Sequence, residues 1–130
     1  MKWVISGVLA RAQRPGYRGE LRHRVPKSDV DKWLEDAKDG GIKSIICLLA
    51  TDELRSYQVE PDLISLYREA GFFVEHIPVE DYQSPPMSPD QLKLVLRAFQ
   101  CLPRPILIHC SAGFGRSRMA IESIIKSGRA

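Results

Sequence analysis

Short apolar runs alternate with longer amphipathic stretches along most of the chain. The runs at residues 44–49, 72–77 and 106–109 are mainly apolar, and Gly71, Pro78 and Pro105 border the last two, which is typical of buried strands. Between them, residues 28–39 and 88–101 repeat apolar positions at helical spacing. Strands separated by helices predict an α/β fold: a mostly parallel central sheet flanked by helices on both faces.

Capping residues locate the helix starts. A capping-box pattern from Ser28 predicts the start of the first helix, and Gly40 and Gly41 predict its end. Pro61 predicts the start of a second helix and Ser88 that of a third. The third helix is expected to bury the stripe Leu92, Val95, Leu96 and Phe99.

The first twelve residues imitate a signal peptide, ending in an Ala-x-Ala pattern. Their apolar stretch is short and broken by Gly7, so we predict a pair of strands instead. No apolar run in the sequence is long enough to cross a bilayer, and we expect no membrane partner.

Composition narrows the class of protein. With 130 residues, 44% of them hydrophobic, we expect residues 1–130 to form a single domain. The net charge of +3 is too mild to indicate nucleic acid. Three cysteines, Cys47, Cys101 and Cys110, form no disulfide framework, which favours a reducing cytoplasm. We expect neither a metal nor a cofactor.

The most informative motif runs from His109 to Ser117, directly after the last apolar run. A strand followed by a glycine-containing loop and a helix can bind an anion, because unpaired backbone N–H groups at the helix N-terminus point toward it. Gly113 and Gly115 let the backbone curl, so the amides can face inward. The expected phosphate-binding residues are Ser111, Ala112, Gly113, Phe114, Gly115 and Arg116.

Cys110, at the mouth of this loop, turns a binding loop into a reactive one. The inward amides, the helix N-terminus and Arg116 all favour its thiolate, which is the nucleophilic form. Arg116 can bind two phosphate oxygens through its planar fork. Ser117 can donate a hydrogen bond to the sulfur, and His109 is expected to order the loop through its ring nitrogens. The alternative for Cys110 is an inert buried cysteine at a strand end.

A proton donor is also needed, and Asp81 is the candidate. It follows a predicted strand and precedes a proline-rich turn, and it lies 29 residues before Cys110. Asp81 would protonate the leaving group and then deprotonate water. Glu80 is the fallback acid, and a solvated loop carboxylate is the alternative reading.

The His-Cys-x-x-Gly-x-x-Arg-Ser pattern of residues 109–117 resembles the signature of the cysteine-dependent protein tyrosine phosphatases, most closely their dual-specificity branch. Residues 77–81 are similar to that branch's acid loop. From residue 36 to 117 the chain is also similar to the group around the cyclin-dependent-kinase-associated phosphatase, through Gly41-Ile42, Glu53-Leu54, Tyr57-Gln58-Val59 and Leu66-Tyr67 up to Gly71.

This resemblance implies a phosphatase that hydrolyses phosphotyrosine, and also phosphoserine and phosphothreonine, through a cysteinyl-phosphate intermediate. Neutral Ala112 and Phe114 disfavour inositol phosphates, and the lack of a tyrosine-bearing substrate loop predicts a shallow pocket. The partner would be a phosphorylated protein or peptide. Basic residues are concentrated in a patch near the N-terminus. They either bind an acidic partner or simply face the solvent: Arg11, Arg14, Arg18, Arg22, His23, Arg24 and Lys27.

Two features leave alternatives open. Cys47 stands where some relatives carry a cysteine that bonds the oxidised nucleophile, although a small core residue explains it as well. Such phosphatases usually continue for further helices after the signature, so the resemblance implies a shortened C-terminal helical region and a possible homodimer that covers the gap. Two other functions remain as alternatives to a phosphatase. One is a pseudophosphatase that only binds phosphorylated partners, and the other is a sulfur-transfer or arsenate-reducing enzyme.

Overall fold

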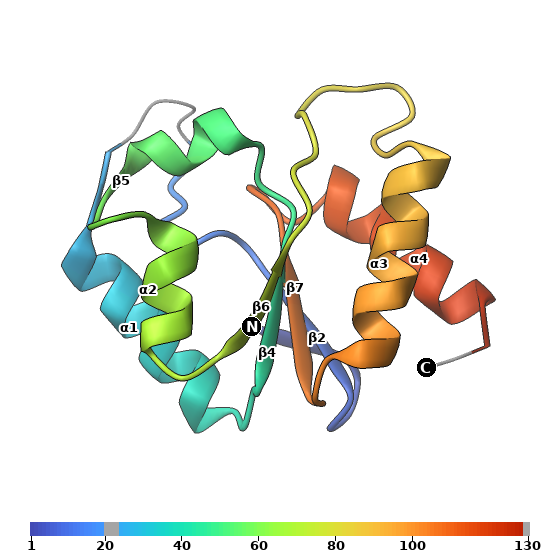
Figure 1. The fold of residues 1–130 in the computed structure, drawn as a ribbon, viewed down its shortest axis with the longest axis horizontal. Coiled ribbons are helices and arrows are strands. Elements are labelled where there is room, and N and C mark those ends of the chain that lie inside the picture. Colours follow the sequence, from blue (N-terminus) through green and yellow to red (C-terminus); the bar gives the residue numbers. More distant parts are fainter. Residues whose placement is uncertain (20–23, 129–130) are drawn as a thin grey trace.

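The computed structural model describes residues 1–19 and 24–128. In that part of the chain a five-stranded sheet forms the centre, in the order β1-β2-β7-β4-β6 (Figure 1). β2, β7, β4 and β6 are parallel, and β1 pairs antiparallel with β2. The strands are β1 (Lys2–Ile5), β2 (Leu9–Ala12), β4 (Ser44–Cys47), β6 (Phe73–His76) and β7 (Ile106–His109).

Helices cover both faces of this sheet, which is seen edge-on in Figure 1. One face carries α1 (Lys27–Asp39) and α2 (Leu63–Glu69), and the other carries α3 (Pro89–Cys101) and α4 (Gly115–Lys126). A hydrophobic core lies on each face of the sheet, and side chains of β4 alternate between the two. Ile45 and Cys47 pack into one core, and Ile46 packs into the other. The predicted mostly parallel α/β fold with helices on both faces is confirmed.

The N-terminal residues form the predicted strand pair, with Lys2 opposite Arg11 in an antiparallel hairpin. Three short elements were not predicted. A short parallel sheet joins β3 (Val25–Pro26) to β5 (Tyr57–Gln58), and a 3₁₀ helix, η1, spans Thr51–Ser56. Pieces this short carry no periodicity that a sequence pattern could show.

Helix starts agree with the sequence in one case and differ in two. Ser88 caps α3, accepting from the Gln91 amide at 3.2 Å, as expected. The capping box predicted at Ser28 is wrong, because α1 begins at Lys27, with Pro26 as its N-cap and no side-chain cap. α2 begins at Leu63, with Asp62 as its N-cap, rather than at Pro61. α4 begins at Gly115, so Arg116 and Ser117 lie in its first turn.

No helix within the described ranges combines the length and the apolar character that a membrane span requires.

Candidate active site

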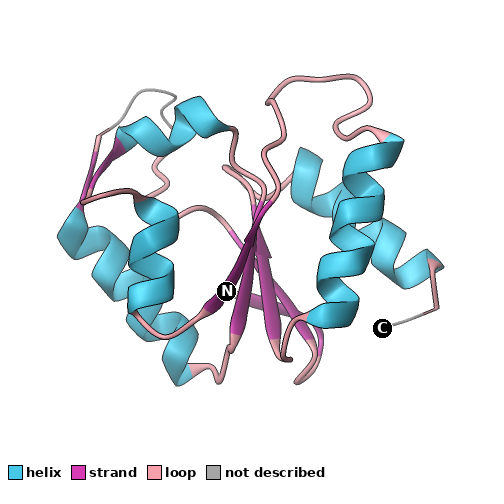
Figure 2. Cartoon of the chain, in the orientation of Figure 1, coloured by secondary structure: helices cyan, strands magenta, loops and turns pink. Residues whose placement is uncertain are grey.

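The parallel strands β4, β6 and β7 bring their carboxyl ends to one edge of the sheet, where the loops that follow them gather (Figure 2). A pocket of about 510 Å³ opens among these loops, and we call it the cradle pocket. Its lining includes Asp81 and Tyr82 from the loop after β6, and Cys110, Ser111 and Arg116 from the segment after β7. Residues far apart in sequence therefore share one cavity.

The cradle loop, residues 110–116, has the backbone shape of an anion receptor. Gly113 has φ +88°, a conformation that favours glycine, and α4 begins two residues later. In the described part of the chain, the amides of residues 111–113 donate to no protein acceptor. The side chain of Cys110, only 2% exposed as a residue, lies at the base of this pocket. Free amides and a helix N-terminus around a thiol suit a tetrahedral anion.

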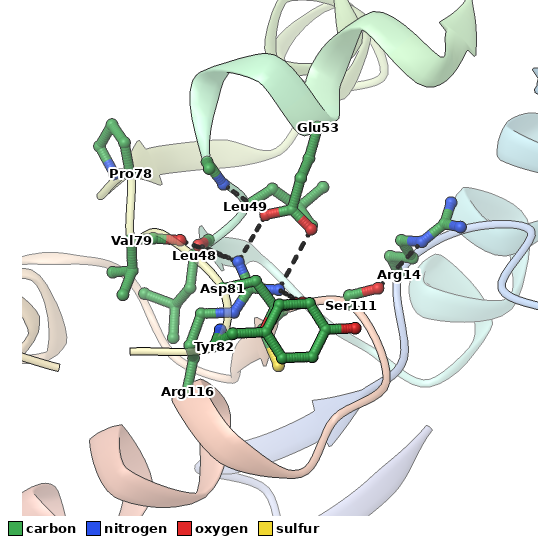
Figure 3. Close-up of polar contacts among 12 residues, drawn as sticks. Arg14, Leu48, Leu49, Glu53, Pro78, Val79, Asp81, Tyr82, Ser111 and Arg116 are labelled. Atoms are coloured by element: carbon green, nitrogen blue, oxygen red, sulfur yellow. Dashed lines mark hydrogen bonds and ion pairs between the residues drawn. The ribbon is translucent and has the colours of Figure 1, made fainter. Parts of the chain in front are cut away.

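Arg116 is held by acceptors from two other loops (Figure 3). Its guanidinium donates to both Glu53 carboxylate oxygens, at 2.5 and 3.2 Å, and to the carbonyls of Val79 at 2.8 Å and Leu48 at 3.4 Å. Burial alone lowers the pKa of Arg116, but the hydrogen-bonded ion pair with Glu53 outweighs it and raises that pKa. The side chain, 3% exposed, is a permanent cation fixed in one orientation.

Glu53 was not singled out as a site residue by the sequence. It lies in η1, just beyond β4, and its Oε1 also accepts from the Ala50 amide at 2.8 Å. The available signal was positional, because a carboxylate directly after a buried strand lies at the same sheet edge as the cradle loop. η1, which carries no sequence signal, is the element that points this side chain at Arg116.

Asp81 lies where the sequence predicted, on the loop after β6. Its Oδ2 is 3.5 Å from Arg116 Nη2, and its Oδ1 accepts from the Tyr82 amide at 3.0 Å. Glu80 is exposed and does not line the cradle pocket, so of the two carboxylates Asp81 is the one that shares a cavity with Cys110. Beside it, Tyr82 has φ +60° and is 81% exposed.

His109 anchors the base of the cradle loop. Its Nδ1 lies 2.9 Å from the Cys110 carbonyl oxygen, which can only accept, so Nδ1 carries the proton and donates. Its Nε2 then accepts from the Tyr67 hydroxyl at 2.9 Å. Burial lowers the pKa of His109 to about 4, consistent with this neutral form. Trp33 stacks on Tyr67 at 5.5 Å and meets the His109 ring edge-on at 5.2 Å.

One predicted contact of the nucleophile, that of Ser117, is not formed, and the disulfide of Cys47 with an oxidised Cys110 stays a prediction. Ser117 Oγ is buried and has no hydrogen-bond partner in the described part of the chain, so the expected bond to the Cys110 sulfur is absent. Cys47 is opposite His109 in the β4–β7 register, one residue from Cys110, yet both are free thiols. Burial raises the pKa of Cys47 to about 12. Cys101 is exposed on α3.

The residues of the predicted basic patch do not form one surface in the structure, because some pair with carboxylates and others line a cavity. Arg18 pairs with Asp29 at 3.7 Å, and Lys27 with Asp31 at 2.8 Å, which is the behaviour of a solvated face. Arg22 and His23 lie outside the described residues, and Arg11 is on β2. Arg14 and Arg24 instead line a second cavity, described below.

Comparison with known proteins decides the family. A profile described as "Tc-R-P: Polymorphic toxin system, DSP-PTPase phosphatase" matches residues 22–129. Cyclin-dependent kinase inhibitor 3 of Homo sapiens is 32% identical over 104 residues, covering 76% of this chain and 47% of the human protein. This chain belongs to the dual-specificity phosphatase family. It spans about half the length of the curated relatives it matches, including the rat protein (Rattus norvegicus), 31% identical over 101 residues, of which it covers 47%.

Solved structures agree with this family at the level of the fold. A crystal structure of kinase-associated phosphatase, with its catalytic-site cysteine replaced by serine, superposes with a TM-score of 0.70 at 26% identity. The match covers 92% of this chain and 65% of that one. The active form of Tk-PTP has the same fold, with a TM-score of 0.63 at 22% identity over 95% of this chain and 70% of that one. The dual-specificity phosphatase resemblance found in the sequence is confirmed.

Proposed function

We propose that this dual-specificity phosphatase domain hydrolyses phosphate monoesters on proteins, at phosphotyrosine and also at phosphoserine and phosphothreonine, through a cysteinyl-phosphate intermediate. One observation carries the proposal. The Cys110 thiol lies at the base of a pocket that Arg116 and Asp81 also line, with Arg116 fixed by Glu53. A nucleophile, an oxyanion partner and a proton donor are the three groups that the reaction requires.

In the first step, the Cys110 thiolate attacks phosphorus, the S–P bond forms and the P–O bond to the substrate side chain breaks. The Arg116 guanidinium and the free amides of the cradle loop hold the three equatorial oxygens as charge shifts onto them. Asp81 gives its proton to the departing oxygen, which leaves as a hydroxyl group. Asp81 Oδ2 is 3.5 Å from Arg116 Nη2, which supports this role because a phosphate held by Arg116 would then have the acid beside it.

In the second step, water attacks the phosphorus of the intermediate, and Asp81 takes a proton from it. The S–P bond breaks, inorganic phosphate leaves and the Cys110 thiolate returns. Ser117 assists if its hydroxyl turns toward the sulfur. Its Oγ is buried in the first turn of α4 and has no competing partner within the described residues, which leaves it available for that bond.

A phosphorylated protein or peptide is the proposed partner. Ala112 and Phe114 line the cradle pocket without adding charge, and Arg116 is the one cation among the described residues of its lining, which matches a single phosphate monoester better than an inositol polyphosphate. Free thiols at all three cysteines are consistent with a reducing cytoplasm. The matched family is described as part of polymorphic toxin systems, so the target phosphoproteins need not belong to the producing cell.

The test is hydrolysis of para-nitrophenyl phosphate and of phosphopeptides by the purified chain, with Cys110→Ser as the control. We expect steady phosphate release that Cys110→Ser abolishes, and phosphate covalently bound to Cys110 of the unmutated enzyme after rapid denaturing quench. Phosphopeptide binding without any release by the unmutated protein would establish the pseudophosphatase alternative.

A further inference from the structure

A second cavity adjoins the cradle pocket. It has a volume of about 400 Å³ and lies between the N-terminal segment, η1 and the cradle loop. Ser111, the residue after the proposed nucleophile, lines both cavities. We call it the arginine pocket; its lining is Arg14, Arg24, Asp52, Glu53, Arg55, Ser56 and Ser111.

The charge of this cavity is positive. Both carboxylate oxygens of Glu53 are engaged by Arg116, which leaves Asp52 as the other acid against three arginines. Arg24 and Arg55 are exposed, and among the described residues neither forms an ion pair with a carboxylate. They differ in this from Arg18 and Lys27, which are close by in the sequence and are paired. Two cations on one small cavity, without paired acids, attract an anion.

Arg14 fixes the third charge against the cradle loop (Figure 3). It is only 6% exposed, and its Nε donates to Ser111 Oγ at 3.2 Å while its backbone amide donates to the Ser111 carbonyl at 2.9 Å. Its Nη1 donates to the Tyr57 hydroxyl at 3.3 Å, and the rings of Tyr17 and Tyr57 lie 5.7 and 5.9 Å from its guanidinium carbon. A buried guanidinium held in this way is a built part of the wall between the two pockets.

We propose that the arginine pocket binds a second phosphate on the same substrate, carried by a residue near the one whose phosphate enters the cradle. This inference rests on the proposed phosphatase function. The shared Ser111 wall makes the pockets neighbours, and an extended peptide advances only about 3.3 Å per residue, so one short segment can fill both. The guanidinium of arginine binds phosphate through paired hydrogen bonds. Three arginines attract a doubly charged phosphate more strongly than they attract a singly charged carboxylate.

The test compares peptides of one sequence that carry phosphotyrosine and, two residues before or after it, serine, phosphoserine or glutamate. The enzymes are the unmutated protein, Arg24→Ala/Arg55→Ala, and a matched control, Lys93→Ala/Arg97→Ala. The control removes two exposed cations from α3, on the opposite face of the sheet. We expect the phosphoserine peptide, in one of the two placements, to show a KM about tenfold lower than the serine peptide.

That gain should vanish in Arg24→Ala/Arg55→Ala and persist in Lys93→Ala/Arg97→Ala, while the serine peptide is hydrolysed equally by all three enzymes. A gain that is missing in both placements, or that survives loss of Arg24 and Arg55, overturns the proposal. An equal gain for glutamate overturns the assignment to phosphate. Failure of the proposed function is distinguishable, because then even the singly phosphorylated peptide yields no phosphate.

Discussion

Glu53 and Arg116, 63 residues apart in the chain, meet through paired hydrogen bonds of 2.5 and 3.2 Å. The pair joins η1 to the first turn of α4, so a short helix without a sequence signal supports Arg116, whose phosphate-binding role the sequence predicts. The guanidinium is planar, and N–H groups along one of its edges donate to this carboxylate and to the Val79 carbonyl. These bonds fix the orientation of its remaining N–H groups.

Glu53→Gln should therefore lower kcat for para-nitrophenyl phosphate by about 10- to 100-fold, because a charged hydrogen bond contributes about 1.5–3 kcal/mol to positioning Arg116. The thermal midpoint serves as the check on folding, and Asp52→Asn, one residue away and exposed, is the matched control. If Glu53→Gln and Asp52→Asn have the same kcat, Glu53 has no positioning role.

Asp81→Ala should slow turnover strongly for substrates with poor leaving groups, such as phosphoserine peptides, and only slightly for para-nitrophenyl phosphate. A phenoxide with a low pKa leaves without a proton, whereas a serine alkoxide does not, and a general acid contributes about 10²–10⁴-fold. Phosphate release is measured for both substrates. Glu80→Ala, on the neighbouring exposed residue, should change neither rate. A small and equal loss for both substrates in Asp81→Ala would sink the assignment.

His109 should make folding sensitive to acid. Burial lowers its pKa to about 4 in the folded protein, whereas an unfolded histidine titrates near 6.5. The unfolded chain thus binds more protons between these values, so the stabilisation is complete above about pH 6.5 and is lost as the pH falls toward 4. The full effect is about 3 kcal/mol. Urea unfolding of the unmutated protein and of His109→Gln, compared from pH 7 to 4, measures it, and the variant should lack this loss. Parallel pH dependences of the two proteins would contradict it.

Cys47 should form a disulfide with Cys110 slowly after mild peroxide treatment, and faster as the pH rises. Its pKa of about 12 leaves little thiolate at neutral pH, and the thiolate is the form that attacks an oxidised sulfur. The protein is oxidised at pH 7 and at pH 9, and mass spectrometry of non-reduced digests measures the amount of linked peptide. The experiment uses the Cys101→Ser variant, so that Cys101 cannot form competing disulfides. If no Cys47–Cys110 peptide appears at either pH, this pair gives the nucleophile no reversible protection.

The fold was predictable because its long elements carry clear periodicity. The buried runs became β4, β6 and β7, and Ser88 with Gln91 marked the start of α3. The sheet-edge site was also predictable, since the order of parallel strands alone brings the loops of Asp81 and Cys110 together.

The supporting contacts were not predictable, because each joins distant residues through tertiary packing. Nothing local marks Tyr67 as the donor to His109, 42 residues away, or Arg14 as the partner of Ser111, 97 residues away. Ser28 shows the converse. Its local capping pattern lies inside α1, which begins at Lys27, with Pro26 as the N-cap.

The wide sequence separation of these contacts has a consequence for how the protein matures. The side-chain pairs Arg14–Ser111 and Glu53–Arg116 each close a long loop of chain, and such contacts form late in folding. A newly made chain therefore carries Cys110 without its phosphate-binding loop until the sheet is complete. Enzymatic activity would appear only at the end of folding, and its recovery after dilution from denaturant would time the last step of assembly.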